Sequence, residues 1–376
     1  MIPEFLHEKG QHCESSSLRD MFEFYGFPMS EAMAFGLDGT MGFGFFDFLD
    51  SSDGDNSPNY PIFIGGKQDT ITPKSLACRI LGINLEKQAF TSADKAWEES
   101  KSLLLQNTPL MLQVDLGYLD YMQEDIEIKE FHFGGHIITL KGYDESKSIA
   151  YVGDSDFEGF QEVSIGQLKN ARSSEHGPNF MQPHNVHYWM TPRPDGKRPP
   201  FNAGLKLAIQ KVVNHMLRPS MSSNGLQGLQ NFSESILEWK EKLSITIKKP
   251  FYDEEISLAR ITFDFIYGEI EEWGTGGACF RNLYKLFLEE LVNNQNLKED
   301  PHGWDASEIN ILQESLPLIE QSAMEWTEFA NCLKLAADKY KDECLNKVNL
   351  YELSKKVKKI HKVEEELFTN LLKIKI

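Results

Sequence analysis

Residues 131–156 read FHFGGHIITLKGYDESKSIAYVGDSD and contain two runs rich in β-branched and aromatic residues. A short polar stretch separates the runs at 136–144 and 148–156, and this pattern predicts an antiparallel β-hairpin. His136 opens the first run after two glycines, and Asp154 lies near the end of the second run. Because a hairpin pairs the start of one strand with the end of the other, we expect His136 and Asp154 to lie side by side.

Short strands and helices alternate on both sides of this hairpin. Further strands are predicted at 61–65, 109–116 and 184–192. Helices are predicted at 16–26, 72–82 and 92–107, with Gly26 ending the first and with Thr72 and Ser92 as the N-caps of the others. The alternation predicts an α+β domain over residues 1–191 with an antiparallel sheet.

A proline-rich stretch separates this domain from a second one. PRPDGKRPPFNAG (192–204) holds four prolines in the nine residues 192–200, so we expect a linker at 192–202. Beyond it, apolar residues recur with the helical period, as at Leu205, Ile209, Val212, Val213 and Met216, and again from Leu353 to Leu371. We therefore predict an all-α domain over residues 203–376.

The charge distribution limits the class of partner. The chain has 38 Lys and Arg against 57 Asp and Glu, a net charge of −19, of which residues 1–200 carry 16 − 30 = −14. Nucleic-acid binding relies on cationic side chains, so this balance excludes it. An acidic first half suits a cationic small molecule.

Other signals of location and cofactor are absent from the sequence. No apolar run approaches the length of a membrane span, and the first residues lack the pattern of a signal peptide, so we expect a cytoplasmic protein without a membrane partner. Four glycines at 36–44 lack the order of a dinucleotide-binding loop, and we expect no cofactor.

Cys13 is the candidate nucleophile. The five cysteines lie far apart without a CxxC pair, which fits neither a disulfide framework nor a zinc site. Cys13 lies just before the predicted helix at 16–26, and the N–H groups and dipole of a helix N-terminus stabilise a thiolate. With His136 as the base and Asp154 orienting the imidazole, the residues form a predicted Cys-His-Asp triad.

Two other interpretations of these residues stay open. His132 and His136 form an HxxxH pair, and His184 and His187 lie in HNVH, so a metal site is an alternative. No spaced set of cysteines or carboxylates completes a tetrahedral site, and we expect none. The other alternative is a structural histidine bonded to backbone, with Asp154 in a turn.

GTGGACFRNLYKLFLEEL (274–291) is the one unusual segment of the helical half. Gly274, Gly276 and Gly277 lead into a predicted helix whose N–H groups are suited to an anion or a carbonyl. Arg281 lies in the first turns of that helix, where a cation opposes the dipole. The position predicts either a salt bridge or a ligand contact.

Several of these segments resemble a known family. HCESSSLRDMFEFYG (12–26), PLMLQVDLGYLDY (109–121), HFGGHIITLKGYD (132–144) and AYVGDSD (150–156) resemble the N-terminal domain of butirosin biosynthesis protein H. GTGGACFRNLYKLFLEEL resembles the helical domain that follows it in that family. The resemblance implies a papain-like cysteine peptidase fold with Cys13 as nucleophile, His136 as base and Asp154 as its orienting partner. It also implies substrate binding at Gly274, Gly276, Gly277 and Arg281.

The family member that gives the name transfers an aminoacyl chain from an acyl carrier protein to an amine of an aminoglycoside. The resemblance thus implies a cysteine acyltransferase of antibiotic or secondary-metabolite biosynthesis, with an acyl thioester as donor and an amine-bearing small molecule as acceptor. A thiol amidohydrolase or peptidase, in which water replaces the amine, is the first alternative. A non-catalytic binding module with a helical interaction domain is the second.

Overall fold

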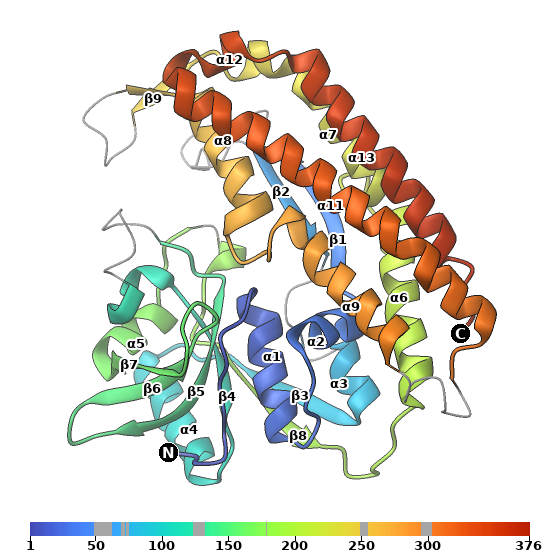
Figure 1. Ribbon diagram of the computed structural model, residues 1–376. Coiled ribbons are helices and arrows are strands. Elements are labelled where there is room, and N and C mark those ends of the chain that lie inside the picture. The colour runs from blue at the N-terminus through green and yellow to red at the C-terminus, as the bar shows by residue number, and fades with distance from the viewer. Residues whose placement is uncertain are drawn as a thin grey trace. The chain divides into compact units, whose positions relative to one another are not determined.

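The computed structural model describes residues 1–48, 62–68, 72, 75–122, 132–177, 179–248, 255–294 and 303–376. The chain divides into two compact units (Figure 1). Unit 1 comprises Met1–Ala34 and Ile71–Phe201, and unit 2 comprises Phe35–Thr70 and Asn202–Ile376. The second crossing between the units falls at the end of the expected linker. The first crossing was not expected, because residues 35–70 were assigned to the same domain as the rest of 1–191.

Unit 1 is built on a six-stranded antiparallel sheet with the order β3-β8-β4-β5-β6-β7. The strands are β3 (Ile83–Gln88), β4 (Leu110–Val114), β5 (His136–Asp144), β6 (Ile149–Gly153), β7 (Phe160–Ser164) and β8 (His187–Pro192). The predicted hairpin is confirmed, since β5 pairs with β6 from Thr139↔Gly153 to Asp144↔Ile149. The mixed α/β class is confirmed as well, whereas β3 and β7 were not predicted.

Four helices and three 3₁₀ turns complete the description of unit 1. They are α1 (Cys13–Phe24), α3 (Leu76–Leu81), α4 (Ala93–Leu105), α5 (Ile165–Arg172), η1 (Leu116–Tyr118), η2 (Asp120–Met122) and η3 (Asn179–Met181). Gly26 follows α1 with φ +87°, and Ser92 caps α4, both as predicted. The cap of α3 differs from the prediction: Ser75, not Thr72, accepts the Cys78 N–H, so α3 begins at Leu76.

Helix α1 packs against β5 (Figure 1). Its buried apolar side chains are Leu18, Met21 and Phe22, and those of the sheet include Leu110, Leu112, Ile138, Leu140 and Val152. Each such side chain contributes about 1.5–3 kcal/mol on burial. The apolar core therefore fixes the position of the N-terminus of α1 relative to the start of β5.

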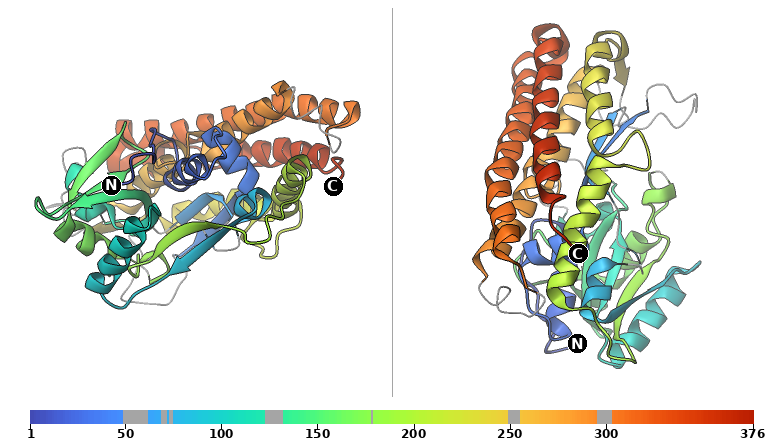
Figure 2. Two further views of the ribbon diagram at one scale, coloured as in Figure 1. Left: turned by 90° about the horizontal axis from the view of Figure 1, so that it is seen from below. Right: turned by 90° about the vertical axis from the view of Figure 1, so that its right-hand side faces the viewer.

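Unit 2 is mainly helical, and its helices follow the predicted periodicity. They are α6 (Phe201–Leu217), α7 (Gly225–Lys242), α8 (Leu258–Tyr267), α9 (Arg281–Asn293), α11 (Ala306–Tyr340), α12 (Cys344–Lys347) and α13 (Leu350–Leu371), with shorter turns at η4 (Gly268–Glu272), η5 (Ala278–Phe280) and η6 (Lys341–Glu343). Helices α11 and α13 run side by side, and α13 also packs on α7 (Figure 2). No described helix has both the length and the apolar composition needed to cross a bilayer.

The described part of residues 203–376 is helical except for one short pair of strands, and unit 2 takes in a second pair from outside that range. Unit 2 includes the hairpin β1 (Met41–Asp47) and β2 (Ile62–Lys67), and the short pair β9 (Thr246–Lys248) and β10 (Glu255–Ser257). Helix α2 (Glu31–Asp38) carries the chain from unit 1 into unit 2. Phe43 of β1 is fully buried between the rings of Phe232 and Trp326. Buried aromatic packing therefore explains why this hairpin belongs to the helical unit.

Candidate active site

Cys13 is the first residue of α1, and the segment before it is held by one carboxylate. Glu31 accepts hydrogen bonds from the Gln11 N–H (2.8 Å), the His12 N–H (2.9 Å) and the Ser15 hydroxyl (2.8 Å). His12 is the N-cap, with extended φ and ψ of −131° and 126°. The Cys13 thiol therefore lies at the positive end of the helix dipole on a fixed backbone.

His136 and Asp154 meet as the hairpin predicted. His136 Nε2 lies 2.8 Å from Asp154 Oδ2, and the two residues are only 5% and 1% exposed. The Cys13 side chain lies close enough to the His136 ring to raise its pKa. Because Nε2 is engaged by Asp154, Nδ1 is the ring nitrogen that remains for the thiol. The structure thus brings Cys13, His136 and Asp154 together within unit 1.

The electrostatics of the pair favour an imidazolium beside a carboxylate. Burial opposes the charged form of His136, but the Asp154 charge and hydrogen bond, together with the contact to Cys13, hold the pKa of His136 well above its usual value. Burial likewise opposes the Asp154 carboxylate, yet His136 keeps the pKa of Asp154 below its usual value. His136 therefore carries a proton near neutral pH and is ready to donate it.

Tyr121 is a site residue that the sequence did not indicate. Its hydroxyl donates to Asp154 Oδ2 over 2.9 Å, on the same oxygen that faces His136, while the Asp156 N–H donates to Oδ1 over 3.3 Å. Burial and the Asp154 charge raise the pKa of Tyr121 well above its ordinary value, so it stays a donor. Tyr121 fixes the orientation of the Asp154 carboxylate.

His7 holds the far side of the Asp154 loop. Its Nδ1 lies 2.6 Å from Asp20 Oδ2, and its Nε2–H donates to the carbonyl oxygens of Asp154 (3.0 Å) and Phe157 (3.2 Å). Burial opposes protonation, but Asp20 and the two carbonyl groups raise the pKa of His7 above its ordinary value. The ring ties α1, through Asp20, to the backbone that presents Asp154.

We expect a pH-dependent contribution of His7 to stability. Its pKa in the folded state exceeds the unfolded value of 6.5, so the stabilisation is complete below 6.5 and is lost as the pH rises through the folded value. His7→Gln should lower the free energy of unfolding by about 3 kcal/mol at low pH. Urea unfolding from about pH 5.5 to about pH 9 measures this difference against wild type.

The control for this prediction is His361→Gln, at a half-buried histidine of unit 2. Its difference from wild type should stay small throughout the same pH series. A His7→Gln difference that does not shrink with rising pH would show that His7 is neutral in the folded protein.

The two histidine pairs do not act as chelates. His132 Nδ1 lies 2.9 Å from Asp115, whereas His136 faces Asp154, so the HxxxH pair diverges onto separate carboxylates. Across the described ranges, no group of three or more His, Cys, Asp or Glu side chains is suited to a metal ion.

The HNVH pair diverges as well. His184 bonds through Nε2 to the Asn179 carbonyl oxygen over 2.8 Å. His187 is fully buried beside Ser100 and Arg172, and burial together with the Arg172 charge lowers the pKa of His187 to about 3. His187 is therefore a neutral structural residue.

The side chain of Arg281 has a structural role, which corrects the expectation of a substrate contact. It is 0% exposed and forms a bidentate pair with Glu364, with Nε–Oε1 at 2.8 Å and Nη2–Oε2 at 2.9 Å. Its Nη1 group donates to the carbonyl oxygens of Gly42 and Cys279. Of the two predicted alternatives, the salt bridge is correct, because the guanidinium is enclosed and its donors are engaged.

The backbone conformation before Arg281 explains why glycines occur there. Gly274, Gly276 and Gly277 have φ values of +70°, +67° and +82°, which glycine adopts without strain. Ala278, Cys279 and Phe280 continue with positive φ. Burial raises the pKa of the Cys279 thiol to about 12, so it is a poor nucleophile. Substrate binding by the three glycines stays a prediction.

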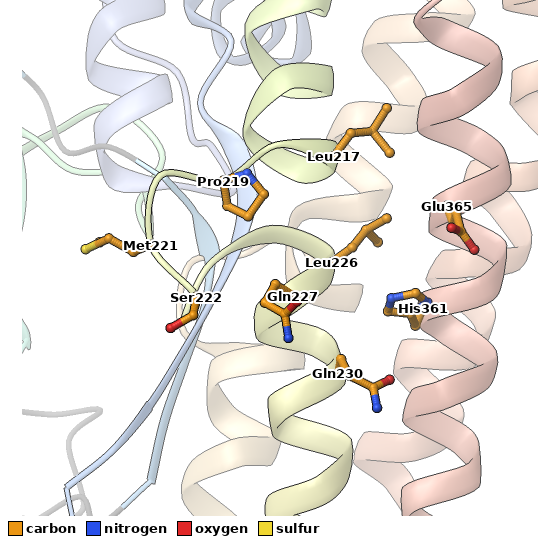
Figure 3. Close-up of a pocket in the computed structure, with 9 residues that line it drawn as sticks. All are labelled: Leu217, Pro219, Met221, Ser222, Leu226, Gln227, Gln230, His361 and Glu365. Atoms are coloured by element: carbon orange, nitrogen blue, oxygen red, sulfur yellow. The ribbon is translucent and has the colours of Figure 1, made fainter.

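Unit 2 has a surface depression of about 550 Å³ where the end of α6 and the start of α7 face α13 (Figure 3). Figure 3 shows Leu226 and Gln230 of α7 directed toward His361 and Glu365 of α13. Its nine lining residues include neither a cysteine nor any predicted site residue. The depression therefore does not compete with the Cys13 site as the location of nucleophilic chemistry.

Comparison with known proteins identifies two regions of the chain. Residues 12–155 match the family model described as butirosin biosynthesis protein H, N-terminal. Residues 166–371 match the model described as domain of unknown function (DUF4872). A search of curated proteins gives no match. The first region contains Cys13, His136 and Asp154, and the second contains Arg281 and Glu364.

Proposed function

The chain belongs to the family in which a butirosin biosynthesis protein H N-terminal domain is followed by a DUF4872 domain, and from that premise we propose that it is a cysteine acyltransferase. The reaction moves an acyl or aminoacyl group from a thioester to an amine through an acyl-enzyme. One observation carries this proposal: a cysteine at a helix N-terminus lies beside a buried histidine whose Nε2 is held by a buried aspartate.

The proposal includes a papain-like arrangement of unit 1. In support, the nucleophile begins a helix that packs on an antiparallel sheet, and the base and its partner come from adjacent strand ends. The role of each residue follows from geometry rather than from its position in the chain. Cys13 is the nucleophile, His136 the acid and base, and Asp154 the group that orients the imidazole.

Acylation begins from a Cys13 thiolate beside protonated His136. The sulfur attacks the thioester carbonyl carbon, a new C–S bond forms, and the donor's C–S bond breaks. His136 gives its proton to the departing thiolate and becomes neutral. Asp154, held by Tyr121, keeps Nδ1 of the ring directed at the sulfur throughout.

Deacylation returns the enzyme to its first state. An amine attacks the acyl-enzyme carbonyl carbon, a C–N bond forms, and the bond to Cys13 breaks. His136 accepts a proton from the attacking nitrogen, which restores the thiolate and imidazolium. The thioester is itself the activated group, so the proposed reaction uses no cofactor.

The proposed donor is an acyl thioester, with an acyl carrier protein as one such donor, and the acceptor is an amine-bearing small molecule. The excess of 30 acidic over 16 basic residues in the first 200 supports a cationic acceptor. We further propose a role in antibiotic or secondary-metabolite biosynthesis in the cytoplasm, by analogy with the protein that names the family.

Intact-protein mass spectrometry tests the proposal. The protein is exposed to acetyl, butanoyl and glycyl thioesters of N-acetylcysteamine, with and without 1,3-diaminopropane. If the protein is a transferase, its mass should increase by that of the acyl group, and Cys13→Ala should abolish this increase. Adding the diamine should remove the acyl group from the protein and yield acylated diamine. If water removes the adduct at the same rate with and without the diamine, the enzyme is an amidohydrolase instead. If none of the three donors gives an adduct, the proposed function is overturned.

A further inference from the structure

A second Asp–His pair lies in unit 1 outside the triad. Asp115 is fully buried, and its carboxylate accepts hydrogen bonds from four donors: the His132 Nδ1–H (2.9 Å), the Ser174 hydroxyl (2.5 Å), the Phe133 N–H (3.0 Å) and the Gly117 N–H (3.0 Å). A carboxylate with this many donors is held in one orientation. The pairing matches that of Asp154 and His136, with the ring nitrogens exchanged.

The His132 ring is partly exposed to solvent, whereas Asp115 is buried. Its side chain is 22% exposed, against 0% for Asp115. The ring stacks on His176 with centroids 3.6 Å apart and planes 10° apart, and Tyr118 lies 5.2 Å away. Since Nδ1 is used by Asp115, Nε2 is the ring nitrogen left for a ligand. Within the described part of the chain, no hydrogen bond engages Nε2.

The pair lies at the same end of the sheet as the triad. Val114, the last residue of β4, pairs with His136, and Asp115 is the next residue. His132 and His136 are four positions apart in the chain, a span of at most about 14 Å between Cα atoms. The segment Asp115–Met122 serves both pairs, because it supplies Asp115 to His132 and Tyr121 to Asp154.

The proposed reaction has a proton that the triad cannot accept. An alkylamine is an ammonium ion at neutral pH, like the side chain of lysine. Two protons must therefore leave the nitrogen to form an amide. His136 accepts one of them as the bond to Cys13 breaks, and it is then fully protonated. The other proton must leave before attack, because an ammonium nitrogen has no lone pair.

We propose that His132 is a second base, oriented by Asp115, which accepts a proton at Nε2 from the ammonium group of the acceptor before attack. This inference rests on the proposed acyl transfer. The free amine then attacks the acyl group on Cys13, His136 takes the second proton, and His132 releases its proton to solvent. Hydrolysis and acylation need no second base, so His132 acts on transfer to cationic amines alone.

The test separates acylation from the two kinds of deacylation. Cys13 is first acylated with whichever of the three thioesters of N-acetylcysteamine loads it best. Single-turnover loss of the adduct is then followed at about pH 7 with 1,3-diaminopropane, which is cationic there, and with hydroxylamine, which is largely neutral. His132→Gln should slow transfer to the diamine by about 10²-fold, the size of a general-base contribution.

His132→Gln should be acylated at the wild-type rate, and its acyl-enzyme should react with hydroxylamine as fast as that of wild type. A merely structural role of His132 would instead predict slowing of all three reactions. Asp115→Asn should show the same pattern, and His184→Asn, at an exposed histidine bonded to Asn179, should match wild type with both nucleophiles. Equal slowing with diamine and hydroxylamine, or no slowing with diamine, overturns the second base while leaving the acyltransferase in place. Failure of wild type to acylate overturns both.

Discussion

Cys13→Ala should abolish acyl transfer, lowering kcat by at least about 10⁴-fold, without unfolding the protein. The thiol sulfur is the attacking atom, and the alanine side chain has no nucleophile to replace it. The Cys13 side chain contributes little to the core, so the thermal midpoint should stay within a few degrees of wild type. Single-turnover transfer from an acyl thioester measures the activity, and circular dichroism checks the fold.

The other two members of the triad give a graded series. His136→Ala should cost nearly as much as Cys13→Ala, because the thiolate loses its proton partner. Asp154→Ala should cost less, since Asp154 acts only through the orientation of His136. Cys13→Ala combined with His136→Ala should be no worse than either alone, because residues that act as a unit are non-additive. If the fold-losses in kcat of the two single variants multiply in the double variant, the triad is contradicted.

The site could be predicted where its signals are local. His136 and Asp154 lie at matching ends of two strands joined by a tight turn, so the hairpin pattern alone predicts their contact. Cys13 is indicated by its position at the start of a helix. Each inference needs only a short window of sequence and the period of its secondary structure.

The residues that sequence analysis missed are those brought in by tertiary structure. His7 reaches the Asp154 carbonyl across 147 positions, and Tyr121 reaches the Asp154 carboxylate across 33. No local period reports such contacts. The placement of β1 and β2 in unit 2 has the same origin, because the partners of Phe43 are Phe232 and Trp326.

Arg281 illustrates how a local signal can have two physical meanings. A cation in the first turn of a helix opposes the dipole, so it requires a compensating anion. The sequence cannot say whether that anion is a ligand or a side chain. The answer is Glu364, 83 positions away on α13, which also accepts hydrogen bonds from Ser322 (2.7 Å) and Trp326 (3.0 Å).

Arg281→Met should therefore lower the free energy of unfolding by about 3–5 kcal/mol, the cost of leaving a buried charge without its partner. Glu364→Gln should have a loss of similar size, because the guanidinium is then the uncompensated ion. The double variant should recover part of the summed loss, since removing both charges removes the desolvation penalty of each. Urea unfolding of the four proteins gives the coupling energy.

Lys355→Ala, which breaks an exposed pair with Glu352, is the matched control and should leave stability nearly unchanged. Turnover decides the question that the sequence left open. Because Arg281 is fully buried, the folded fraction of Arg281→Met should keep the kcat/KM of wild type at temperatures well below its midpoint. A variant that is as stable as wild type but has lost affinity for the amine acceptor would instead show that the guanidinium binds substrate.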